Sequence, residues 1–178
     1  MGKIHRPLPV KFFTGILTSI PALVPALRER LADTLGPIDL GSDPFPFDAT
    51  DYYDKEMGKP ITRYFLSFSE LRQASQLAGI KVCTNRTEEE FDARHPQVAR
   101  PVNLDPGYIE EAKLVLASTK NFYHRILLGD GIYGEVTLHY ENGQWQPFPW
   151  TYPDFRSGRY DDFFTLLRNT YRAQLRKL

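Results

Sequence analysis

Strand-type and helix-type hydrophobic patterns follow one another along this chain in an order that few folds accommodate. Residues 10–18 are rich in aromatic and β-branched side chains, which is typical of a strand. Leucines then recur every four residues, at positions 23, 27, 31 and 35, and predict a helix with one apolar face. Gly36 and Pro37 end this helix. A short strand over 38–40 follows, so the chain begins with a β-α-β order.

The middle of the chain continues the alternation with weaker signals. Residues 43–58 predict an aromatic and acidic loop or an irregular hairpin, because two prolines in this stretch disfavour regular strand pairing. Residues 61–68 alternate with period two and predict a strand. The sequence then predicts a broken helix that begins near Ser69, is interrupted near Gly79 and resumes after Thr84 or Thr87, where Thr87 and Glu90 have capping-box spacing.

The segment around Asp105 has two interpretations. In one, Asp105, Pro106 and Gly107 form a turn that precedes a strand over 114–118. In the other, Asp105 caps a helix whose first position is Pro106 and which continues to about Ser118. We prefer the helix, because two glutamates follow near its start, where they complement the helix dipole.

The C-terminal third predicts a β-meander followed by a helix. Glycine-containing turns at 129–131 and 142–143 separate three strand-type segments, 125–128, 132–140 and 144–148. The final helix begins near Tyr160 and has Phe163, Leu167, Tyr171 and Leu175 on one face.

These elements together predict a single α+β domain over residues 1–178. The first six elements follow the β-α-β-β-α-β order of a ferredoxin-like (split βαβ) core, to which the C-terminal β-meander and the terminal helix are added. We expect an antiparallel or mixed sheet with helices on one face.

Composition and charge restrict the function classes. Lys plus Arg and Asp plus Glu both total 22, so the formal net charge is zero. Nucleic-acid binders usually carry a basic balance, so RNA is not an expected partner. The longest apolar run, 20–27, contains two prolines and is far shorter than the ~20 residues of a membrane span. Cys83 is the only cysteine, so no intrachain disulfide can form. We therefore expect a cytoplasmic protein.

Two familiar ligand motifs fail in this sequence. Gly58 and Lys59 resemble the end of a phosphate-binding loop, but Pro60 stands where Ser or Thr is needed. Four acidic residues offer hard oxygen ligands, Asp48, Asp51, Asp54 and Glu56, but their spacing matches no EF-hand. A solvated acidic turn is the simpler interpretation, so we expect no metal site, and no cofactor is identified.

The strand over 132–140 carries a polar row that a site could use. Period-two alternation places one set of side chains on one face, Tyr133, Glu135, Thr137 and His139, and a second set on the other, Ile132, Val136, Leu138 and Tyr140. A solvated sheet face alternates in the same way and is the preferred explanation. Basic side chains, Lys113, Lys120, His124 and Arg125, surround the neighbouring segment 114–118.

The leading hypothesis is a protein that binds an anionic or phosphorylated small molecule, with a nucleotide as one candidate and with catalysis as an option. His124 and Glu135 are the candidate catalytic acid and base. The candidate ligand-binding residues are Asp105, Lys113, Lys120, Arg125, Tyr133, Trp150 and Tyr152; the cations anchor the anion and the aromatic rings stack. The alternative is a non-catalytic protein- or RNA-interaction module that uses the aromatic loops and a basic stripe on the last helix, Arg168, Arg172 and Arg176; no protein partner is identified.

Four strings occur in order along the chain, at 50–58, 102–108, 113–120 and 149–154. With them the sequence resembles a family of bacterial proteins known as domain of unknown function 4416, over nearly its whole length. The resemblance implies a bacterial and cytoplasmic origin. It implies no reaction and no catalytic residues.

Overall fold

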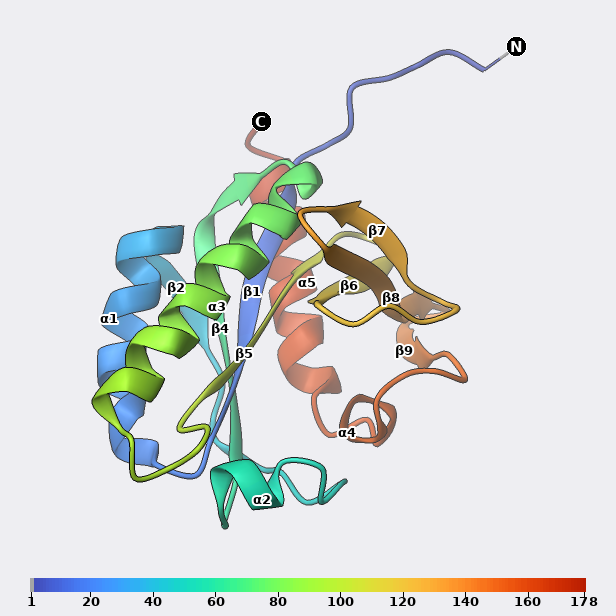
Figure 1. Cartoon of the computed structure of the whole chain (residues 1–178). Helices are drawn as coiled ribbons and strands as arrows, with labels where there is room; N and C mark the ends of the chain where they lie inside the picture. The colour runs from blue at the N-terminus through green and yellow to red at the C-terminus, as the bar shows by residue number, and fades with distance from the viewer. Residues whose placement is uncertain (1) are drawn as a thin grey trace.

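The structure, a computed structural model, describes residues 2–178 and contains one large sheet with helices packed on it (Figure 1). Over those residues the strands are β1 (Val10–Thr18), β2 (Ile38–Gly41), β3 (Phe45–Pro46), β4 (Thr62–Arg72), β5 (Asn103–Ile109), β6 (Lys113–Ser118), β7 (Ile126–Gly129), β8 (Ile132–Glu141) and β9 (Gln144–Pro147). The helices are α1 (Val24–Leu35), α2 (Asp54–Met57), α3 (Leu77–Arg94), α4 (Pro153–Arg156) and α5 (Asp161–Leu175), with short 3₁₀ turns before α1 and α3. The predicted α+β class is confirmed.

The sheet order is β2-β4-β1-β5-β6-β8-β7, and each pair of neighbouring strands is antiparallel. The short strand β3 pairs with β4, and β9 pairs with β8. The predicted C-terminal strands and their turns are present, but the predicted β-meander is wrong, because β7 and β9 both pair with the edge of β8 that lies opposite β6. No helix of residues 2–178 is both long enough and apolar enough to cross a membrane.

Helices cover both faces of the sheet, so the predicted arrangement with helices on one face is wrong. Phe12 and Ile16 of β1 pack into a cluster with α1 and α3, whereas Phe13 packs into a second cluster with α5. Every residue of β1 is buried. A strand that is apolar on both faces needs cover on both, and α5 supplies the second layer (Figure 1).

The preferred helix after Asp105 is also wrong, and the alternative with a strand over 114–118 is confirmed. Residues 103–109 form β5, which pairs with β1 along its whole length. Pro106 is tolerated because β6 pairs with β5 only from Gly107 onward, so the proline has a single strand neighbour. Pairing with the buried β1 overrides the local turn and cap signals.

The expected helix start near Ser69 and the expected resumption after Thr84 or Thr87 are wrong as well. Strand β4 continues to Arg72, which pairs with Val10. Helix α3 begins only at Leu77 and runs without interruption to Arg94, with Gly79 on its exposed side. The expected hydrophobic face of β8 is split by a register shift at Thr137. Because of this register shift, Ile132 and Val136 pack with α3, whereas Leu138 and Tyr140 pack with α5.

Gly107 of β5 pairs with Leu116 of β6 and has no room for a side chain. A Cβ atom at this position would lie 2.4 Å from the carbonyl oxygen of Val115 and 2.9 Å from the side chains of Leu116 and Phe13. Gly107→Ala should therefore lower the free energy of unfolding by about 3 kcal/mol, the upper end of overpacking effects. Gly79→Ala, in open space on α3, is the control and should raise it by about 0.5–1 kcal/mol. Urea unfolding measures both, and equal stability of the two variants would contradict this packing.

Candidate ligand-binding site

A cleft of about 860 Å³ lies where β5 and β6 separate. The two strands pair only over Gly107–Ile109, so the first half of β5 and the end of β6 diverge and leave space between them. The segment around α2, the second half of α3, and α4 close the remaining sides. The cleft therefore brings together segments from both halves of the chain.

Arg63 of β4 forms the floor of the cleft. Its guanidinium donates to Asp105 Oδ2 at 2.8 Å and to Asp154 Oδ2 at 3.2 Å. The residue is only 4% exposed. The close approach requires Gly15 on β1, because a Cβ atom there would lie 2.8 Å from Arg63 Nη1. Burial raises the pKa of Asp105, but the positive charges of Arg63 and Lys81 outweigh burial and hold that pKa below its usual value.

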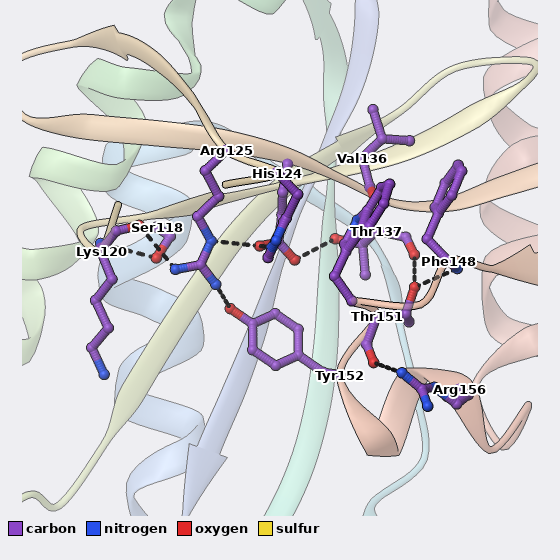
Figure 2. A network of polar contacts seen from close by, with 12 residues as sticks. Ser118, Lys120, His124, Arg125, Val136, Thr137, Phe148, Thr151, Tyr152 and Arg156 are labelled. Atoms are coloured by element: carbon purple, nitrogen blue, oxygen red, sulfur yellow. Dashed lines mark hydrogen bonds and ion pairs between the residues drawn. The ribbon is translucent and has the colours of Figure 1, made fainter. Parts of the chain in front are cut away.

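Arg125 projects into the cleft from the loop before β7. Its Nε donates to Glu135 Oε2 at 2.7 Å, its Nη1 to the carbonyl oxygen of Lys120 at 2.9 Å, and its Nη2 to the Tyr152 hydroxyl at 2.7 Å (Figure 2). A guanidinium has five N–H donors, so two remain after these three bonds. Glu135 is 2% exposed and holds Arg125 from behind. The geometry fixes the guanidinium and leaves donors free for a ligand.

Lys120 lies beside Arg125 at the rim of the cleft. Its Nζ donates to the Tyr52 hydroxyl at 2.5 Å and sits 4.7 Å from the centre of the Tyr52 ring. Tyr52 is 60% exposed and Tyr152 is 38% exposed. Two cations and two partly exposed phenol rings thus share one side of the cleft.

His124 and Glu135 lie behind Lys120 and Arg125 and do not line the cleft. His124 Nε2 is 3.1 Å from Glu135 Oε2, and the imidazole stacks on the Trp150 indole with ring centres 5.2 Å apart. The loop that carries Trp150 is fastened by Thr151, whose hydroxyl donates to the carbonyl oxygen of Thr137 and accepts from the Phe148 N–H (Figure 2). His124 and Glu135 are therefore placed to hold Arg125 rather than to contact a ligand.

A protein-family model described as a domain of unknown function, DUF4416, matches residues 8–171. This chain belongs to the DUF4416 family. The resemblance seen in the sequence is confirmed, and the family description names no activity. No curated protein and no solved structure matches the chain.

In this DUF4416 protein the predicted site residues fall into two groups. Those that line the cleft are Asp105, Lys120, Arg125 and Tyr152. Those that do not are Lys113, His124, Tyr133, Glu135 and Trp150. Lys113 lies in the sheet outside the cleft, where it forms an ion pair with Glu110 and is opposite His139 of β8.

Sequence reasoning missed the cleft residues on β4 and α3. Arg63 carried a signal, since it is a cation close to the apolar and aromatic residues Ile61, Tyr64, Phe65 and Leu66, and Lys81 is another cation beside apolar helix positions. Lys81 is buried, donates to the carbonyl oxygen of Leu104 at 2.6 Å and lies 3.5 Å from Glu88. Such buried cations mark positions where the chain must supply counter-charges.

The acidic loop and the arginine stripe have partners within the chain. Asp48 pairs with Arg159, Asp54 with Lys59 and Glu56 with Arg100, each at 2.7 Å. Within the described residues, no three His, Cys, Asp or Glu side chains come together in a way that could hold a metal ion.

On α5, Arg168 lies 3.8 Å over the Tyr140 ring and donates to the Glu111 carbonyl oxygen, and Arg172 contacts the Glu111 carboxylate at 3.3 Å. Two members of the stripe are therefore engaged on the protein's own surface.

Proposed function

We propose that the cleft binds an anionic small molecule through a phosphoryl or carboxylate group. The observation that carries this proposal is Arg125, which lines the cleft and whose guanidinium is held by Glu135, Tyr152 and the Lys120 carbonyl oxygen yet keeps two N–H donors without a partner. Lys120 adds a second positive charge beside it. Tyr52 and Tyr152 offer ring faces for a planar part of the ligand, so a nucleotide is one candidate.

In this proposal His124 and Glu135 are positioning residues. Glu135 is almost fully buried and contacts both Arg125 and His124, so it orients the guanidinium and balances its charge. A catalytic role for either residue would need the ligand to reach past Arg125. The proposed function is therefore ligand binding, and a catalysed reaction would be an extension of it.

The strand order β2-β4-β1-β5, with α1 and α3 as the crossover helices, supports a ferredoxin-like core over β1 to β5. We propose that β7, β8, β9 and α5 were added to this core as one domain. We also propose that Lys120 and Arg125, which together form the anion corner, lie where core and addition meet. A bacterial cytoplasmic location belongs to the same proposal, carried by the family resemblance.

The test is calorimetric titration of the full chain with inorganic phosphate, adenosine 5′-monophosphate and citrate. Saturable binding is expected, and Lys120→Met should weaken it about tenfold, which corresponds to about 1.4 kcal/mol. Lys177→Met removes an exposed lysine at the end of the chain and should leave the affinity unchanged. Absence of binding by all three probes, or equal affinity of both variants and the parent, would reject the anion corner.

A second candidate function, a protein-interaction module, is favoured by one observation. A run of exposed apolar side chains covers β7 and the loop before it, namely Phe122, Tyr123, Ile126, Leu127 and Leu128. Exposed apolar patches on an edge strand are common at protein interfaces. Self-association or partner binding that is lost in Leu127→Asp but kept in Leu166→Asp, a change at a leucine 52% exposed on α5, would support this function.

A further inference from the structure

The two long walls of the cleft carry opposite charges. One wall is a single face of α3, on which Asn85, Glu88, Glu89 and Asp92 follow the spacing of adjacent helical turns. The other wall holds Lys120 and Arg125. The cleft is therefore polarised rather than uniformly basic.

Most charges inside the cleft are already balanced by the protein. Arg63 is held by two aspartates, Lys81 lies beside Glu88, and Arg100 pairs with Glu56. Arg125 is balanced by Glu135. The charged groups of the cleft that have no ion-pair partner decide which ligand charges the cleft can accept.

The unbalanced charges are Glu89 and Asp92 on α3 and Lys120 at the opposite rim. Among residues 2–178, neither of the two carboxylates has an ion-pair partner, and Lys120 has no carboxylate partner. The acidic groups outnumber the basic ones, so a polyanion such as a triphosphate meets net repulsion in this cleft.

Two polar atoms in the cleft wall also lack partners. Asp92 Oδ1 is buried without a hydrogen bond, and so is Nε of the 4% exposed Arg63 at the floor. Burial raises the pKa of Asp92, an effect that the nearby Arg100 only partly opposes. A buried acceptor without a donor costs free energy, and the Asp92 carboxylate lacks both an ion-pair partner and a hydrogen bond at this oxygen.

We infer that the ligand of this cleft is amphoteric, with one anionic group at Lys120 and Arg125 and a protonated amine or guanidinium at Glu89 and Asp92. The inference rests on the proposed function and narrows it to a class. Its anion is a phosphate monoester or a carboxylate, and both fit the same cations. A ligand of this kind satisfies the free charges on both walls at once.

The test compares matched ligand series by calorimetry on the full chain. The probes are ω-aminoalkyl phosphates of increasing length, the alkyl phosphates of the same lengths, and the corresponding ω-amino carboxylic and alkanoic acids. At one length the amino ligand should bind about tenfold or more tightly than its partner without the amine. The phosphate and carboxylate arms show which anion the corner prefers.

Two substitutions on α3 test whether the preference for the amine depends on the α3 wall. Asp92→Asn and Glu89→Gln should each reduce the preference for the amine about tenfold, while binding of alkyl phosphates becomes slightly tighter because a negative charge is removed. Asp33→Asn, an exposed change on the neighbouring helix α1, should leave the preference intact.

The outcomes separate this inference from the proposed function. Equal binding of the amino and non-amino series would overturn the amphoteric ligand and keep the anion corner. A preference for the amine that survives in both α3 variants would also overturn it, because the ammonium would then bind elsewhere. Binding of neither series at any length would overturn both.

Discussion

Replacing Arg63 with methionine is expected to lower the free energy of unfolding by about 3–5 kcal/mol, because the substitution leaves the buried carboxylate of Asp154 without its cation. Arg63 is 4% exposed, and its guanidinium contacts Asp105 and Asp154, whose own side chain is 4% exposed. The arginine also lies within 5.9 Å of three aromatic ring centres, so little water can take the place of the lost guanidinium beside the two carboxylates. Urea unfolding at neutral pH measures the change.

The pH dependence of this variant provides a second signature. Arg63 holds the pKa of Asp105 below its usual value against the effect of burial. A carboxyl with a lowered folded-state pKa stabilises the fold above its unfolded pKa of about 3.9, and this contribution is lost as pH falls through the folded value. In the variant, burial without Arg63 shifts the Asp105 pKa upward, so the difference between parent and variant should be largest at neutral pH and should narrow as pH falls through that raised pKa and on below about 4.

Arg86→Met is the matched control, since Arg86 is exposed on α3 and has no ion-pair partner in the described part of the chain. A surface substitution of this kind should change the stability by less than about 0.5 kcal/mol. If the two variants proved equally stable at every pH, the buried triad would not contribute to the fold.

The sequence predicted the elements whose patterns are local. β1, α1, the two glycine-containing turns on either side of β8 and α5 each carry a complete period or turn signal within one segment, and the structure confirms them. β5 was missed because Asp105, Pro106 and Gly107 have strong local preferences for turns and helix starts. Those preferences are overridden by pairing with β1, which lies far away in sequence.

The same distinction explains the candidate site. Lys120, Arg125 and Glu135 are close in sequence, so a cluster of opposite charges could be anticipated there. The floor of the cleft depends on contacts between positions 42 and 91 residues apart, from Arg63 to Asp105 and Asp154. No periodicity reports such distant pairs, and the α3 wall was hidden because its acidic residues resemble an ordinary solvated helix face.

Replacing Glu135 with glutamine should separate stability from ligand binding. Glu135 is 2% exposed, and its carboxylate contacts Arg125 at 2.7 Å and His124 at 3.1 Å. The amide keeps the shape but removes the charge that balances the largely buried Arg125. The free energy of unfolding should fall by about 3 kcal/mol, as expected when one partner of a buried ion pair is lost.

The affinity for anions should change in the opposite direction. Without the carboxylate, the positive charge of Arg125 acts on the cleft alone, so inorganic phosphate should bind more tightly, by about tenfold. Glu29→Gln, an exposed change on α1, should alter neither quantity. Thermal unfolding with and without phosphate measures stability, and calorimetry measures affinity. A loss of both stability and affinity would contradict this expectation and would mean that the orientation of Arg125 by Glu135 matters more for binding than the charge that Glu135 neutralises.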